Sequence, residues 1–63
     1  MKNNVKLYRK QKGLTQEQLA EHLSVTRQTI NAIENNKYNP TLELALKVSR
    51  FLGIPVELLF ILD

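Results

Sequence analysis

The absence of cysteine is the feature that most limits what this chain can fold into. A chain of 63 residues can bury only one small core, and chains of this size often depend on disulfides or a metal for stability. Without a thiol, neither a disulfide framework nor a thiolate zinc site is available. Packed apolar side chains must therefore hold the fold, and we expect one domain over residues 1–63.

Apolar residues recur at helical spacing between stop signals, and no segment alternates as a strand would. The first pattern, Asn4–Lys12, places Val5 and Tyr8 on one face and ends at Gly13, which can adopt the left-handed conformation of a helix end. The second begins with Thr15-Gln16-Glu17-Gln18, a capping box that satisfies free backbone N–H groups. Its inward residues are Leu19, Ala20 and Leu23.

Three further helices follow at short intervals. Thr26 caps the third after a turn of only Ser24 and Val25, and Thr41 caps the fourth, which ends at Gly53. Pro55 suits the first turn of the last helix, Val56–Leu62. The expected inward residues are Ile30 and Ile33 in the third helix and Leu42, Ala45, Val48 and Leu52 in the fourth. These patterns predict an all-α fold of five helices, in which the second and third form a helix-turn-helix.

A helix-turn-helix indicates what the polar residues of the third helix contact. The second helix of such a unit can lie in the major groove of DNA, with its N-terminal residues at the base edges. Arg27 and Gln28 occupy that first turn, and Asn31 follows one turn later. Arginine can pair with guanine O6 and N7, and glutamine with adenine N6 and N7. The spacing therefore predicts base reading by these three residues.

Polar residues at the edges of this face are candidates for phosphate contacts. They are Gln16, Asn35, Lys37 and Tyr38. For Tyr38, packing of the ring against the loop is an equal alternative. The lysines at positions 2, 6, 10 and 12 either attract DNA nonspecifically or form a solvated surface, and the formal net charge of +3 favours an anionic partner only weakly.

Three blocks of sequence resemble the phage repressor/Cro family of regulators, also called the Xre family. They are Gly13–Ala20, Val25–Asn35 and Asn39–Leu42, and the resemblance covers nearly the whole chain. It is closest to small one-domain bacterial and archaeal members. The resemblance implies a compact five-helix, lambda-repressor-like domain that binds double-stranded operator DNA as a homodimer and usually represses transcription. It also implies that no cofactor or small-molecule ligand is needed.

The resemblance assigns roles to individual residues. The position of Gln16 is a phosphate contact, and that of Asn35 touches the DNA backbone. Arg9 and Glu34 match an internal ion pair. The positions that face the groove are Thr26, Arg27, Gln28 and Thr29, and the whole recognition helix runs from about Thr26 to Asn35.

Two residues depart from the family pattern. Ala32 stands where some relatives have a long base-reading side chain, which reduces readout there to contact with a thymine methyl group. Ser24 replaces the glycine that is frequent in the turn, and a left-handed backbone there would cost roughly 1–2 kcal/mol.

The terminal run Leu58–Leu62 has more apolar surface than one side of a short helix can bury. We expect Leu59 in the core, and Leu58, Ile61 and Leu62 in a two-fold dimer interface. The run is too short to span a bilayer, and Met1 is followed by polar residues, so we expect a soluble cytoplasmic protein.

Catalysis finds no support in the sequence, and we expect no enzyme, cofactor or metal. Ser24 and Ser49 lack a placed histidine and acid, and His22 has no cysteine or second histidine with which to bind a metal. His22 is therefore expected at or near the surface, without a role. The competing hypothesis is a protein-interaction module, such as the antitoxin of a toxin–antitoxin pair. The polar exterior of the third helix favours DNA, because protein-binding grooves expose aromatic or aliphatic anchors.

Overall fold

The computed structural model describes residues 1–62. They contain five helices and one pair of two-residue strands. The strands are β1 (Lys2–Asn3) and β2 (Phe60–Ile61). The helices are α1 (Val5–Gln11), α2 (Gln16–Leu23), α3 (Arg27–Glu34), α4 (Leu42–Leu52) and α5 (Val56–Leu59). The predicted all-α, five-helix class is confirmed. None of the helices within residues 1–62 has the length and apolarity that a bilayer crossing requires.

Threonine side chains begin three of the helices. Thr15, Thr26 and Thr41 are the N-caps of α2, α3 and α4, and each side-chain oxygen accepts a hydrogen bond from the backbone N–H three residues further on. The Gln18 side chain in turn accepts from the Thr15 N–H at 2.9 Å, which completes the capping box. These local contacts start each helix where the sequence predicted it.

A residue with a left-handed backbone follows each of α1 to α4. These residues are Gly13, Ser24, Asn36 and Gly53, with φ between 58° and 75°. Glycine adopts this conformation without strain, whereas Ser24 and Asn36 carry a Cβ. Asn36 was not predicted; its side chain accepts a hydrogen bond from the Asn3 amide at 3.0 Å, which helps to hold the turn.

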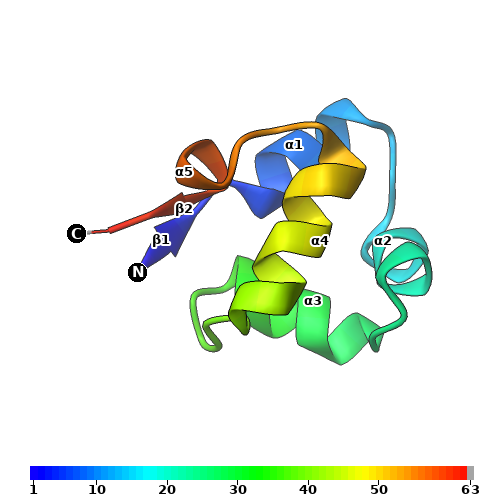
Figure 1. Ribbon diagram of the computed structural model, residues 1–63. Helices are drawn as coiled ribbons and strands as arrows, with labels where there is room; N and C mark the ends of the chain where they lie inside the picture. Colours follow the sequence, from blue (N-terminus) through cyan, green and yellow to red (C-terminus); the bar gives the residue numbers. More distant parts are fainter. Residues whose placement is uncertain (63) are drawn as a thin grey trace.

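The core lies where α4 crosses α2 and α3, with α1 and α5 closing one end (Figure 1). Its buried members are Val5, Leu19, Ala20, Leu23, Ile30, Ile33, Val48, Leu52 and Leu59. Leu42 was predicted to face inward, but it is 72% exposed. Leu42 is the first residue of α4, before the helix reaches the core, and Leu44 packs against the core in its place.

The end of the chain differs from the predicted helix Val56–Leu62. α5 ends at Leu59, and β2 pairs antiparallel with β1, with Lys2 opposite Ile61 and Asn3 opposite Phe60. Asn4 donates from its backbone N–H to the Leu59 carbonyl at 2.8 Å, and from its side chain to the Leu58 carbonyl at 3.0 Å. These donors satisfy carbonyls at the end of α5, so the chain can leave the helix and pair with its own N-terminus.

A buried ion pair joins α1 to the end of α3. Arg9 donates to both carboxylate oxygens of Glu34, at 2.7 and 3.1 Å, and to the Leu14 carbonyl at 2.6 Å. The Arg9 side chain is 7% exposed and that of Glu34 is 2% exposed. The Gln16 amide also donates to Glu34, at 3.0 Å. The Glu34 carboxylate thus ties together α1, α2 and α3, and the Arg9 guanidinium adds the loop after α1.

We predict that Ser24→Gly leaves the free energy of unfolding unchanged or raises it by up to about 1 kcal/mol, because glycine removes the left-handed strain at some cost in chain entropy. Denaturant unfolding measures the change. Gly13→Ala is the matched control: an added Cβ meets no atom within 4 Å, so only backbone strain is introduced and stability should fall. A clear loss of stability in Ser24→Gly would contradict the strain at this turn.

We predict that Glu34→Ala lowers the free energy of unfolding by about 3–5 kcal/mol, because it leaves the Arg9 guanidinium buried without its partner. The matched control is Glu43→Ala, which removes the exposed Glu43–Lys47 pair and should cost about 0–1 kcal/mol. Thermal or urea unfolding of both variants makes the comparison. Equal effects would show that the Arg9–Glu34 pair is no stronger than a surface pair.

Candidate nucleic-acid interface

The turn between α2 and α3 presents one polar face of α3 to solvent. Ser24 and Val25 separate the two helices, and Thr26 then caps α3. Ile30 and Ile33 are buried against the core. Arg27, Gln28 and Asn31, the three predicted base-reading residues, are all exposed. α3 therefore offers two amides and a guanidinium to solvent.

The side chains of Thr26 and Thr29, which were predicted to face the groove, also form hydrogen bonds with each other's residue at the start of α3. The Thr26 hydroxyl accepts from the Thr29 N–H at 3.2 Å and lies 3.0 Å from the Thr29 hydroxyl. Thr29 is also half-buried. Both hydroxyls thus stabilise the start of α3, which fixes the position of Arg27 and Gln28 between them.

Three side-chain amides form a chain of hydrogen bonds across α2 and α3. Asn35 donates to the Asn31 side chain at 3.1 Å, and Asn31 donates to Gln16 at 3.4 Å. Gln16 donates to Glu34, which is held by Arg9. The chain brings Asn31 together with Gln16 and Asn35, two of the predicted phosphate-binding residues. The buried ion pair therefore also orients the exposed amides.

Sequence reasoning missed this chain of amides. A helical spacing of four residues between Asn31 and Asn35 would have indicated that these two can touch. The contacts of Gln16 join α2 to α3, and no local pattern indicates them.

Lys37 and Tyr38 lie in the loop after α3. The Lys37 N–H donates to the Ala32 carbonyl at 2.9 Å, which closes the helix, and its side chain is exposed. Tyr38 is 43% exposed, so its ring is only partly packed. Both residues follow directly on the exposed face of α3, but neither joins the chain of amides.

The other flank of α3 is acidic. A hollow of about 400 Å³ lies there, lined by Glu17 and Glu21 of α2 and by Arg27 and Gln28 of α3. Carboxylates repel phosphates, so a nucleic-acid backbone is disfavoured at this flank. Gln16 and Asn31, whose side chains contact each other, carry no negative charge.

His22 lies on the surface away from these residues. Its ring stacks on that of Phe51, with 4.5 Å between the ring centroids.

A solved structure shares this arrangement of helices. It is the crystal structure of the hypothetical transcription factor NHTF from Neisseria, which matches with a TM-score of 0.80 and 33% sequence identity. The match covers 89% of this chain and 65% of that chain, so this chain spans just under two thirds of its length.

The curated relatives include transcriptional regulators, a repressor and an antitoxin. An uncharacterized HTH-type transcriptional regulator of Methanocaldococcus jannaschii is 52% identical over 63 residues, covering 100% of this chain and 96% of the relative. The immunity repressor protein of Bacillus phage phi105 is 42% identical over 84% of this chain and 37% of its own length. Antitoxin HipB of Escherichia coli is 38% identical over 89% of this chain and 64% of its own length.

The sequence profile of the Helix-turn-helix family matches residues 5–59, which include all five helices. The resemblance drawn from the sequence blocks is thereby confirmed. The chain belongs to the Xre-like helix-turn-helix family of DNA-binding transcriptional regulators.

Proposed function

We propose that this protein is a sequence-specific transcriptional repressor that binds duplex DNA as a homodimer, with α3 in the major groove. The observation that carries the proposal is the exposure of Arg27, Gln28 and Asn31 on the helix whose Ile30 and Ile33 are buried in the core. In this role residues 1–63 act as one DNA-binding domain in the cytoplasm, where the operator would be, without a cofactor.

Base reading is proposed for the exposed residues of α3. Arg27 and Gln28, at the start of the helix, are the residues that reach bases first, and Asn31 extends the contact by one turn. Thr26 and Thr29 contribute next to them, where the groove approaches the start of the helix. Ala32 is half-buried, so it adds at most an apolar contact.

Phosphate binding is proposed for Gln16, Asn35, Lys37 and Tyr38, which surround that face. Gln16 is the first residue of α2, whose N-terminal N–H groups attract anions. The Asn35 amide is held by Asn31, and an amide that is already oriented loses less conformational entropy on binding. Lys37 supplies the positive charge.

Repression is the mode of action that we infer from the relatives. A dimer on an operator excludes other proteins from the same DNA, and one relative is named an immunity repressor. Another relative is named an antitoxin, which supports a second candidate function, that of an antitoxin with a protein partner. The two functions are not mutually exclusive.

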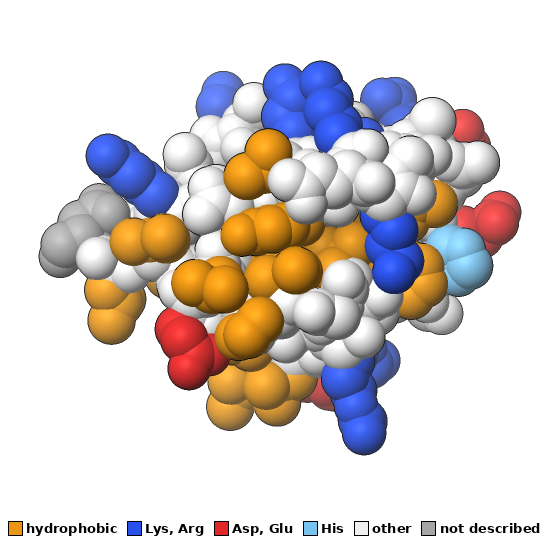
Figure 2. All heavy atoms as spheres, turned by 90° about the horizontal axis from the view of Figure 1, so that it is seen from above, with side chains coloured by type: hydrophobic (Ala, Val, Ile, Leu, Met, Phe, Trp, Pro, Cys, Tyr) orange, Lys and Arg blue, Asp and Glu red, His pale blue; other side chains and the backbone are white. Residues whose placement is uncertain are grey.

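The proposed dimer interface consists of the apolar residues at the end of the chain. Leu58, Ile61 and Leu62 are 50%, 41% and 87% exposed, whereas Leu59 is fully buried. Figure 2 shows apolar side chains gathered on the face that includes α1 and α5 and continuing toward the chain ends. A two-fold contact would cover this surface on both copies, and half-sites one DNA turn apart require about 34–36 Å between the two recognition helices.

Base contacts and phosphate contacts can be separated by two substitutions. We predict that Gln28→Ala weakens binding to the preferred operator by about 1–3 kcal/mol per half-site and leaves nonspecific binding unchanged. Lys37→Ala should weaken both kinds of duplex alike and reduce the log–log salt slope by about one per lost contact. The operator is first selected from a random duplex library, and both variants are then titrated on matched and scrambled duplexes at several salt concentrations.

Equal losses by Gln28→Ala on both duplexes would exclude sequence reading through Gln28. Selection without an enriched two-fold consensus would instead favour the interaction module.

For the dimer, we predict that sedimentation equilibrium at micromolar concentration gives twice the chain mass, and that Leu62→Ser gives the single chain mass. Leu62 is 87% exposed, so its replacement should remove interface surface without disturbing the core. Leu42→Ser is the control, because Leu42 is 72% exposed on α4, outside the proposed interface. A monomeric native protein, or a monomer produced equally by Leu42→Ser, would rule out this interface.

A further inference from the structure

Two adjoining hollows lie between the end of α2 and α4, on residues to which no DNA contact has been assigned. The larger, of about 340 Å³, is lined by His22, Leu23, Ser24, Lys47, Arg50 and Phe51. The smaller, of about 220 Å³, shares Leu23, Ser24 and Lys47 and adds Val25, Thr41, Glu43 and Leu44. Because they share three lining residues, the two hollows form one open groove, which we call the α2–α4 groove.

The wall of the larger hollow is aromatic. The Phe51 ring is half-buried and stacks on His22 with an interplanar angle of 26°. The Lys12 ammonium lies 5.7 Å from the centroid of the same ring. These contacts hold the ring in place at the wall of the hollow, which the largely buried Leu23 also lines. A fixed aromatic wall of this kind suits an apolar side chain of a partner.

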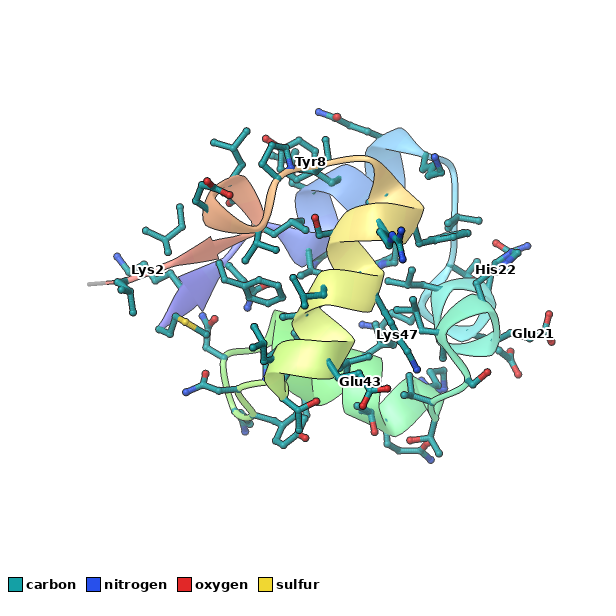
Figure 3. All side chains as sticks on the ribbon, in the orientation of Figure 1. Lys2, Tyr8, Glu21, His22, Glu43 and Lys47 are labelled. Carbon is teal, nitrogen blue, oxygen red and sulfur yellow. The ribbon has the colours of Figure 1, made fainter. Side chains whose placement is uncertain are left out.

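The rim of the larger hollow is basic. Lys47 and Arg50 lie on it, and the carboxylate that lines the groove, Glu43, belongs to the smaller hollow. Lys47 pairs with Glu43 at 3.4 Å, but both side chains are more than half exposed, so this pair is weak and can be exchanged. Arg50 forms no ion pair with any acidic side chain in the part of the chain that the structure describes. Figure 3 shows Lys47 extending from α4 toward α2, on which His22 lies.

We propose that the α2–α4 groove binds an acidic segment of a partner protein. An apolar side chain of that segment packs against Phe51 and Leu23, and neighbouring carboxylates meet Lys47 and Arg50. The apolar wall distinguishes this surface from a phosphate-binding patch, which needs cations and N–H donors but no such wall. Two hollows that share lining residues offer room for a peptide segment rather than for a single small organic acid.

A short peptide tests the groove in the full chain. The probe is acetylated and amidated, with a central phenylalanine flanked by glutamates, and it is titrated into ¹⁵N-labelled protein. We expect saturable shifts of the backbone amides that line the groove, those of Leu23, Ser24, Lys47, Arg50 and Phe51. Arg50→Gln should raise the peptide Kd by about two- to fivefold, as expected for an exposed charge pair. Lys6→Gln, which removes an exposed cation on α1, is the matched control and should leave the Kd unchanged.

Four comparisons can overturn the proposal. A peptide with glutamines in place of the glutamates should bind more weakly, and equal binding would contradict recognition of the carboxylates. A peptide with alanine in place of the phenylalanine should also bind more weakly, and equal binding would contradict the apolar anchor. Phenylacetate that binds as tightly as the peptide would show that the groove takes a small organic acid. Arg50→Gln should leave duplex DNA affinity unchanged, and a loss equal to that of Lys37→Ala would assign Arg50 to phosphate binding. These outcomes are independent of whether α3 reads bases.

Discussion

The Arg9 guanidinium is the group on which the placement of α1, α2 and α3 depends. A buried cation costs several kcal/mol unless charged and polar partners surround it, so packings that lack these partners are penalised. Here the partners are the Glu34 carboxylate and the Leu14 carbonyl, supplied by the end of α3 and by the loop before α2. Gln16 shares the same carboxylate. The ion pair thus favours this packing of the three helices over others. Burial of the apolar core supplies the stability of the fold.

Stability and recognition are connected through the same carboxylate. From Glu34 the hydrogen bonds run through Gln16 to Asn31 and Asn35, so the exposed amides are oriented before any ligand arrives. An amide chain also has a direction, because each N–H donates to the next oxygen, and reversing one amide would oppose the others. The amides of the surface proposed for DNA are therefore ordered in part by hydrogen bonds to one another. A polar surface that is ordered in advance adapts less easily to a wrong ligand.

The parts of the structure that could be predicted from the sequence are those decided locally. Thr15, Thr26 and Thr41 mark helix starts through contacts within three residues, and helical spacing identified nearly all of the core. The β1–β2 pair could not be predicted, because strands of two residues show no alternation and their partners lie at opposite ends of the chain. The left-handed Asn36 is contacted by Asn3, which is 33 positions away in the sequence. The polar face of α3 was predicted, whereas the amide chain that orients it depends on tertiary packing.

The pairing of the two chain ends also determines where we expect local opening of the fold to begin. The helix-turn-helix joins neighbours in sequence, but the Asn4 side chain and the Leu58 carbonyl are 54 positions apart, and the two ends lie side by side (Figure 1). Closing such a long loop costs more chain entropy than closing a short one, and only a two-residue ladder and a few side chains repay it. We therefore expect the amides of β1 and β2 to exchange with solvent sooner than those of α2 and α3. A second copy that covered Leu62 would slow that exchange at both ends of the chain at once.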